Sequence, residues 1–140
     1  MKTFIFKISL QENPKIYRDI EVLENTNLYK LAEVINDAYD FAFDHPFGFF
    51  DNLTDPYQSK KSYDLFADIK DEGIEPTGAK SVGKTKVKEV WKSVGDKMLF
   101  LFDYGDEWLF VVELKSFGDK DSAKKYPVTL NKIGKSPKQY

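Results

Sequence analysis

Two short stretches of the chain carry side chains that can do acid–base or metal chemistry. The first is Asp44-His45, and the second is residues 103–108, of sequence DYGDEW. A histidine beside a carboxylate serves as a general base or a metal ligand, and carboxylates bind hard ions such as magnesium or manganese. If the two stretches meet in space, Asp44, His45, Asp103 and Asp106 form a candidate site for a metal-dependent hydrolase.

The same residues also have a purely structural interpretation. A lone histidine is more often structural than catalytic. In residues 103–106, aspartate caps backbone amides, Gly105 supplies a positive φ, and Trp108 fills the core. Under this interpretation Asp103, Asp106 and Glu107 alone stay open as functional residues.

Recognition of a partner without catalysis is the function that the sequence favours most. Aromatic side chains and arginine are common anchors in interfaces. Arg18 interrupts the apolar register of its strand, for which an edge position or an ion pair is the alternative explanation. No residue is assigned as catalytic or as a metal ligand, and the candidate binding residues are Arg18, Asp44, His45, Asp103, Tyr104, Asp106, Glu107 and Trp108.

Composition excludes several classes of protein. The chain has 140 residues, 41% of them hydrophobic, which is enough for one core. With no cysteine and one histidine, it has no disulfide, thiolate zinc site, cysteine nucleophile or multi-histidine metal site of its own. Residues 1–10 alternate, and no apolar run approaches about 18 residues, so we expect a soluble, cytoplasmic protein without a membrane partner. The sequence indicates no particular cofactor.

Charge is distributed unevenly along the chain. The net charge of -2 and the isoelectric point near 5.5 argue against a general nucleic-acid binder. Seven lysines against two aspartates nevertheless give residues 115–140 a charge of +5, which leaves -7 for the first 114 residues. Both a protein partner and, through a lysine-rich tail at residues 116–140, a nucleic-acid partner therefore stay open.

Residues 78–85 satisfy the bare spacing of a phosphate-binding P-loop, because Gly78 lies five residues before Gly83-Lys84-Thr85. A P-loop also requires a buried strand directly before it. Residues 69–77 are instead rich in charge, and residues 68–83 have the composition of a long surface loop. We therefore expect a loop that leads into a short amphipathic helix, capped by Thr85 and ending near residues 93–95.

Alternating and helical periods predict the elements that position these residues. Period-two alternation predicts strands at residues 3–10 and 16–22, which form an opening hairpin. Apolar residues at spacings of three and four predict one long helix over residues 28–42, capped by residues 25–27. Shorter strands are expected at residues 47–52 and 62–67.

Residues 98–114 are the most strongly patterned part of the chain. The run 98–102 is continuously apolar, which predicts a strand covered on both faces. Residues 108–114 alternate and complete a hairpin around the acidic turn, with Trp108 expected to be buried. The predicted fold is α+β: a mostly antiparallel sheet of about five to six strands packed against one long and one short helix. We expect one domain over residues 1–140, with residues 116–140 as a basic, partly ordered tail.

The chain resembles the plasmid ORF-three-like family, first named from a root-inducing plasmid and also found as a passenger protein of insertion elements. The most specific part is Gly95-Asp96-Lys97 together with the turn at residues 103–106 and Trp108. Further matching landmarks are residues 7–10, 16–22, 26–28, Leu31, Val34-Ile35, Asp44-His45, Phe47 and Phe49. The likeness runs from about residue 2 to residue 127.

Two departures from the family pattern affect what the resemblance implies. Phe110 stands where the family often has histidine, and residues 134–137 replace an ending that contains cysteine and acidic residues. A metal or redox role that depends on those residues is not carried over to this chain. The resemblance implies an α+β domain with an association to mobile elements, and neither a serine nor a tyrosine recombinase constellation is present.

Overall fold

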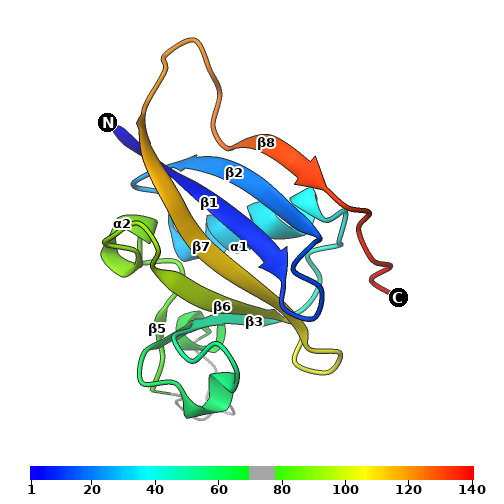
Figure 1. Ribbon diagram of the computed structural model, residues 1–140. Coiled ribbons are helices and arrows are strands. Elements are labelled where there is room, and N and C mark those ends of the chain that lie inside the picture. The colour runs from blue at the N-terminus through cyan, green and yellow to red at the C-terminus, as the bar shows by residue number, and fades with distance from the viewer. Residues whose placement is uncertain (70–77) are drawn as a thin grey trace.

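The computed structural model describes residues 1–69 and 78–140. Within these residues the backbone forms one eight-stranded sheet, with helix α1 against one face (Figure 1). The strand order is β5-β4-β3-β6-β7-β1-β2-β8, and β4 and β5 make the one parallel pair described. The elements are β1 (Lys2–Leu10), β2 (Tyr17–Leu23), α1 (Leu28–Ala38), β3 (Phe47–Phe50), β4 (Ser62–Asp64), β5 (Lys80–Ser81), α2 (Val87–Val90), β6 (Lys97–Phe102), β7 (Trp108–Asp119) and β8 (Val128–Ile133), with 3-10 turns at Pro56–Gln58 and Phe66–Asp68.

The α+β class and the mostly antiparallel sheet are confirmed, but the predicted number of strands was too small. Eight strands stand in the described residues where five to six were expected. The two additional strands lack an alternating pattern. β5 has two residues, and β8 exposes nearly every side chain. Because each is held mainly by backbone hydrogen bonds to a neighbour, side-chain periodicity carried no signal for it.

β1 lies near the middle of the sheet, between β2 and β7. Its residues Phe4, Phe6, Ile8 and Leu10 share one face and are at most 4% exposed. They form the main core with α1. The alternation at residues 3–10 therefore placed the core face of this strand correctly.

β6 is covered on both faces, as its continuous apolar run predicted. Met98, Phe100 and Phe102 belong to the main core on the side of α1. Leu99 and Leu101 are fully buried in a second, smaller cluster on the opposite face. This double burial holds the strand rigidly, and the acidic turn follows directly after it.

Helix α1 begins where Asn27 accepts a hydrogen bond from Lys30 N at 2.7 Å. It ends earlier than the predicted residue 42. Asp40 has a φ of 59°, its N–H donates to Asp37 O, and Phe41 N–H donates to Asn36 O. This left-handed closure stops the helix and sends residues 41–46 back along the sheet.

No helix among the described residues is long and apolar enough to cross a membrane.

Residues 78–90 do not form a P-loop. The two-residue strand β5 lies between Gly78 and Gly83. The amide of Gly83 donates to the carboxylate of Asp68 at 2.9 Å. The following helix α2 is one turn long and ends at Val90, short of the predicted residues 93–95. Thr85 does not cap it, because Lys86 occupies the N-cap position; the Thr85 hydroxyl donates to Ser81 O at 2.6 Å. Half of the expected surface loop at residues 68–83, namely residues 70–77, lies outside the described part of the chain.

The basic segment 116–140 contributes directly to the sheet. β7 continues through Asp119, so residues 116–119 pair with β1. After the connection at residues 120–127, β8 pairs with β2 and forms one edge of the sheet. Residues 134–140 then run toward the end of the sheet that carries the acidic turn (Figure 1).

Candidate functional site

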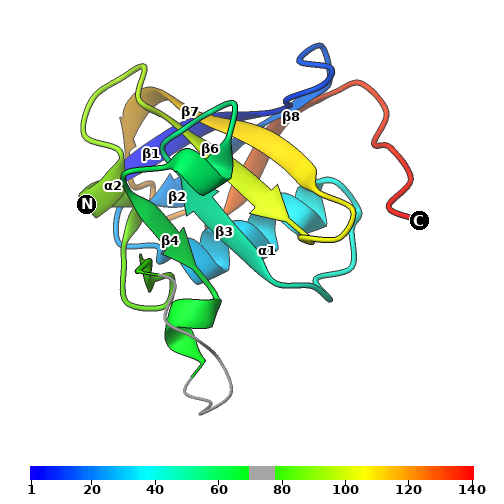
Figure 2. The same ribbon diagram turned by 90° about the horizontal axis from the view of Figure 1, so that it is seen from below.

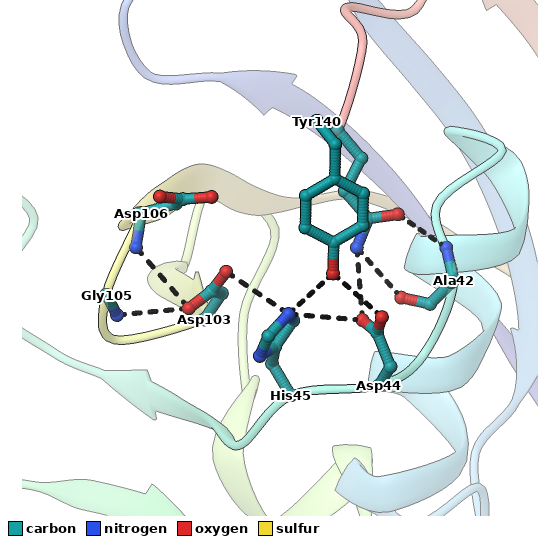
Figure 3. A network of polar contacts seen from close by, with 8 residues as sticks. Ala42, Asp44, His45, Asp103, Gly105, Asp106 and Tyr140 are labelled. Carbon is teal, nitrogen blue, oxygen red and sulfur yellow. Dashed lines mark hydrogen bonds and ion pairs between the residues drawn. The ribbon is translucent and has the colours of Figure 1, made fainter.

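The acidic turn is held by Asp103. Its Oδ1 accepts hydrogen bonds from Gly105 N at 3.0 Å and from Asp106 N at 3.4 Å (Figure 3). Positive φ values occur at Asp103 (67°) and Glu107 (52°), not at Gly105, so the expected role of Gly105 was wrong. Aspartate tolerates this conformation because its side chain bonds to nearby backbone amides. The turn consequently directs Asp106 and Glu107 into solvent.

The two stretches that carry the candidate acid–base or metal-binding side chains, Asp44-His45 and residues 103–108, lie next to each other. Asp103 N donates to Pro46 O at 2.9 Å, which ties the turn to the loop before β3. His45 Nε2 lies 3.5 Å from Asp44 Oδ1 and 3.5 Å from Asp103 Oδ2 (Figure 3). Three of the candidate binding residues therefore form one cluster, although nearly sixty positions of sequence separate them.

Tyr140 completes this cluster, and the sequence provided no signal for it. Its hydroxyl donates to Asp44 Oδ2 at 2.7 Å and lies 2.6 Å from His45 Nε2 (Figure 3). The hydrogen bond to Asp44, followed by desolvation and then by the charges of Asp44, Asp103 and Asp106, raises the pKa of Tyr140 to about 12. Gln139 also binds this loop, with one bond to Asp44 and two to the backbone of Ala42.

The cluster uses the imidazole nitrogen as a hydrogen-bond donor. A tyrosine has one hydroxyl proton, and Tyr140 donates it to Asp44. The hydroxyl oxygen therefore accepts from His45 Nε2–H. In this arrangement Nε2 has no free lone pair with which to take a proton or bind a metal.

Neither does the geometry favour a metal site. The described residues contain no group of three or more histidine, cysteine, aspartate or glutamate side chains placed to hold a metal ion. Asp106 contributes its backbone amide to the turn, and its side chain is exposed. The four-residue set Asp44, His45, Asp103 and Asp106 is thus partly assembled, without the geometry of a metal centre.

Arg18 lies apart from the cluster and is 3% exposed. Its guanidinium donates to Ala38 O at 3.0 Å, Ile133 O at 3.0 Å and Ser136 Oγ at 2.8 Å. It lies on β2, an internal strand, and stacks over the ring of Tyr39. Arg18 therefore fixes the start of the segment that brings Tyr140 to Asp44. It does not lie at the predicted edge position, and it makes no ion pair with any residue that the structure describes.

A cavity of about 190 Å³ lies on the other side of the acidic turn. Its lining includes Glu12, Asp106 and Glu107, together with Trp108. No lysine or arginine is among the described residues that line it. Trp108 is half-buried rather than buried as expected, and its indole Nε1 has no hydrogen-bond partner among the described residues. Three carboxylates thus border this cavity.

Tyr104 faces away from this cavity. Its ring lies 5.4 Å from that of Phe66, and it borders a separate hollow near the 3-10 turn at Pro56–Gln58. Burial, followed by the charge of Asp64, raises the pKa of Tyr104. Tyr104 and Trp108 therefore line two different hollows, although both belong to the stretch at residues 103–108.

Replacing Asp103 tests how the turn is held. Asp103→Ala is expected to lower the free energy of unfolding by about 2 kcal/mol, because two backbone amides lose their acceptor and φ stays positive. Asp103→Asn keeps an acceptor oxygen and is expected to cost about 0.5 kcal/mol. Urea unfolding followed by tryptophan fluorescence measures both. An equal loss in the two variants would mean that the charge facing His45, and not the turn, carries the stabilisation.

The fold and the site together define an α+β sheet domain with an acidic, partly hollowed end. The chain belongs to the plasmid pRiA4b ORF-3-like protein family, whose model matches residues 2–139. The likeness was expected to end at about residue 127. The match extends further and includes Ser136, which Arg18 contacts, and Gln139. The family resemblance is thereby confirmed.

A solved structure supports the fold. The chain is similar to the crystal structure of MM3350, a protein of unknown function from Methanosarcina mazei Go1, with a TM-score of 0.77 and 20% sequence identity. The similarity covers 97% of this chain and 71% of that one. No curated protein matches the chain.

Proposed function

We propose that this chain is a non-catalytic binding module that recognises a cationic segment of a partner protein. The binding surface is the acidic end of the sheet, which we define as Glu12, Asp44, Asp103, Asp106 and Glu107. The observation that carries the proposal is the cavity of about 190 Å³, lined by three of these acids and Trp108 without a described basic residue. The resemblance to insertion-element passenger proteins supports an association with mobile elements as part of this proposal.

The chemistry of the cavity fits a guanidinium or ammonium group. Carboxylates form charge-assisted hydrogen bonds with such groups, and arginine binds them in a bidentate manner. An aromatic ring beside the carboxylates adds a favourable cation–π contact. Asp106 and Glu107 are exposed on a turn whose backbone is already ordered, so little conformational entropy is lost on binding.

The contacts of His45 favour binding over hydrolysis. A general base needs a free nitrogen, and a metal centre needs converging ligands. Here Nε2, the imidazole nitrogen that faces Asp44 and Asp103, is bonded to the Tyr140 hydroxyl, and the described residues hold no metal-binding group. His45 accordingly acts to join the loop before β3 to the acidic turn.

Titration with a fluorescein-labelled arginine-rich peptide tests the proposal. The wild-type chain should bind it and should not bind a glutamate-rich peptide of the same length. Asp106→Asn/Glu107→Gln should weaken binding about tenfold, which corresponds to about 1.4 kcal/mol. Because Trp108 borders the cavity, its fluorescence should change on binding, and this change should disappear in Trp108→Phe.

The matched control is Asp37→Asn/Asp119→Asn, which removes two exposed charges away from the acidic end. This variant should bind the arginine-rich peptide with the wild-type affinity. Equal weakening in both variants would show that overall charge, and not the cavity, attracts the peptide. That result would overturn the proposal.

A further inference from the structure

Exposed lysines are concentrated in residues 80–97, which we call the lysine segment. Its six lysines are Lys80, Lys84, Lys86, Lys88, Lys92 and Lys97, and all six are exposed. The segment contains two acidic residues, Glu89 and Asp96, so its net charge is +4. The remainder of the chain is correspondingly acidic.

The carboxylates of the two acidic residues accept hydrogen bonds from backbone amides. Glu89 accepts a hydrogen bond from Lys86 N at 2.6 Å, and Asp96 accepts from Lys92 N at 2.8 Å and Ser93 N at 3.0 Å. Among the described residues, no carboxylate lies within 4.0 Å of any of the six ammonium groups. The acidic residues at 71, 72 and 75 lie outside the described part of the chain. Within the described part the lysines are unneutralised.

The backbone of the segment is fixed so that these lysines point outward. Thr85 O accepts from Leu28 N at 2.9 Å, and Val87 N donates to Thr26 O at 2.8 Å. Val87 is fully buried, while Lys86 and Lys88 on either side of it are exposed. The segment therefore presents its charges on an ordered backbone.

The lysine segment and the acidic turn lie on opposite sides of the molecule. Strand β6 begins at Lys97, the last residue of the segment, and ends directly before Asp103. Its six residues span about 20 Å. Both views show α2 on one side and the turn after β6 on the other (Figures 1 and 2). A polyanion at the lysine segment is thus kept away from the carboxylates of the acidic turn. The nearer carboxylate of Asp68 accepts a hydrogen bond from Gly83 N at 2.9 Å.

We infer that the lysine segment binds duplex nucleic acid through its phosphates, independently of base sequence. Single strands are bound by stacking bases on exposed aromatic rings, but the segment's one aromatic residue, Trp91, is fully buried. An anionic membrane would favour exposed apolar anchors, and Val94 is the one large apolar residue exposed here. Ammonium groups without an aromatic platform suit the phosphate backbone of a duplex.

This surface differs from the lysine-rich tail that the sequence suggested. The tail lysines are divided among three places, one of which is Lys132 on the edge strand β8. Lys120, Lys124 and Lys125 lie in the connection at residues 120–127, whereas Lys135 and Lys138 lie on the segment that ends at the acidic cluster. The proximity of Asp44 and Asp103 opposes phosphate binding there. The tail's net charge of +4, from six lysines against Asp119 and Asp121, is consequently not gathered on one surface.

The salt dependence of duplex binding tests the inference. Fluorescence anisotropy with a labelled 20-base-pair duplex should show log Kobs falling with log salt concentration at a slope of about -5, if all six lysines contact phosphates. Lys84→Gln/Lys86→Gln/Lys88→Gln should make this slope less steep by about 2.7 and weaken binding. Lys84→Arg/Lys86→Arg/Lys88→Arg should retain the wild-type slope, which separates charge from side-chain identity.

The matched control is Lys120→Gln/Lys124→Gln/Lys125→Gln, with the same change of net charge. Its slope should stay within about 0.9 of the wild-type value, equivalent to less than one phosphate contact. Equal effects of the two triple variants, tighter binding of a single strand than of the duplex, or binding of phosphatidylserine vesicles without binding of the duplex would each overturn the inference.

If circular dichroism shows that Lys84→Gln/Lys86→Gln/Lys88→Gln is unfolded, Lys86→Gln and Lys88→Gln alone should each reduce the slope by about 0.9. The acidic end is unaltered in all these variants, so failure here leaves the arginine-rich peptide test intact.

Discussion

Trp91→Ala is expected to lower the free energy of unfolding by about 4 kcal/mol, the largest effect of any substitution considered for this chain. Trp91 is fully buried, and its ring contacts Phe6 edge-on at a centroid distance of 4.8 Å. Its indole N–H donates to Val112 O at 3.1 Å. The substitution therefore leaves a large cavity in the main core and removes the hydrogen bond from the indole to the Val112 carbonyl.

Urea unfolding followed by far-ultraviolet circular dichroism measures this loss. Trp91→Phe keeps an aromatic ring but removes the N–H, so it should cost about 1–2 kcal/mol. Trp108→Phe is the matched control, because Trp108 is half-buried and its indole N–H has no described partner to lose. If Trp108→Phe were the more damaging of the two phenylalanine variants, Trp91 would not be the main aromatic residue of the core.

Arg18→Met is expected to lower the free energy of unfolding by about 3 kcal/mol. The guanidinium is buried, and its loss leaves Ala38 O and Ile133 O without their donor. Methionine keeps an apolar side chain over Tyr39 but supplies no hydrogen bond. Because Arg18 also binds Ser136, residues 134–140 should detach from the acidic cluster.

Two readouts separate this structural role from the binding role suggested by the sequence. Urea unfolding should show the loss of stability, and hydrogen exchange should become faster at Ala42, whose amide donates to Gln139. Lys132→Met is the control, because Lys132 lies opposite Arg18 in the β2–β8 register and is exposed. An Arg18→Met variant with wild-type stability and weakened peptide binding would return Arg18 to the binding surface.

Most strands were predictable because alternation reports burial on one face of a sheet. This holds for β1, where Phe4 to Leu10 point to α1, and for β6, whose continuous run reflects burial on both faces. It failed for β8, whose exposed side chains impose no pattern. Helix α1 was predicted four residues too long because apolar residues continue past Ala38 into the core while Asp40 turns the backbone.

The candidate site was predictable in part. Asp44, His45 and Asp103 attracted attention as residue types, and the turn was recognisable from aspartate and glycine in tight succession. Tyr140 carried no such signal, since an aromatic residue in a lysine-rich segment has many possible positions. Its contact depends on Arg18 and on the pairing of β8 with β2. The lysine segment could not be predicted for a similar reason. Whether its side chains form ion pairs depends on residues that lie near them in space and not in the sequence.

The sequence by itself determined the α+β class, the main strands, the family, and the acidic turn after residue 102. The family was recognised from matching motifs, whereas the other features depend on local hydrophobic period and on turn chemistry, both of which act over a few residues. The tertiary structure alone decided that His45 meets Asp103, that Tyr140 occupies the imidazole nitrogen, and that Arg18 is internal. It also placed the lysine segment and the acidic end at opposite ends of β6. Such contacts join residues far apart in the chain, and they arise from strand pairing and packing, which no local pattern records.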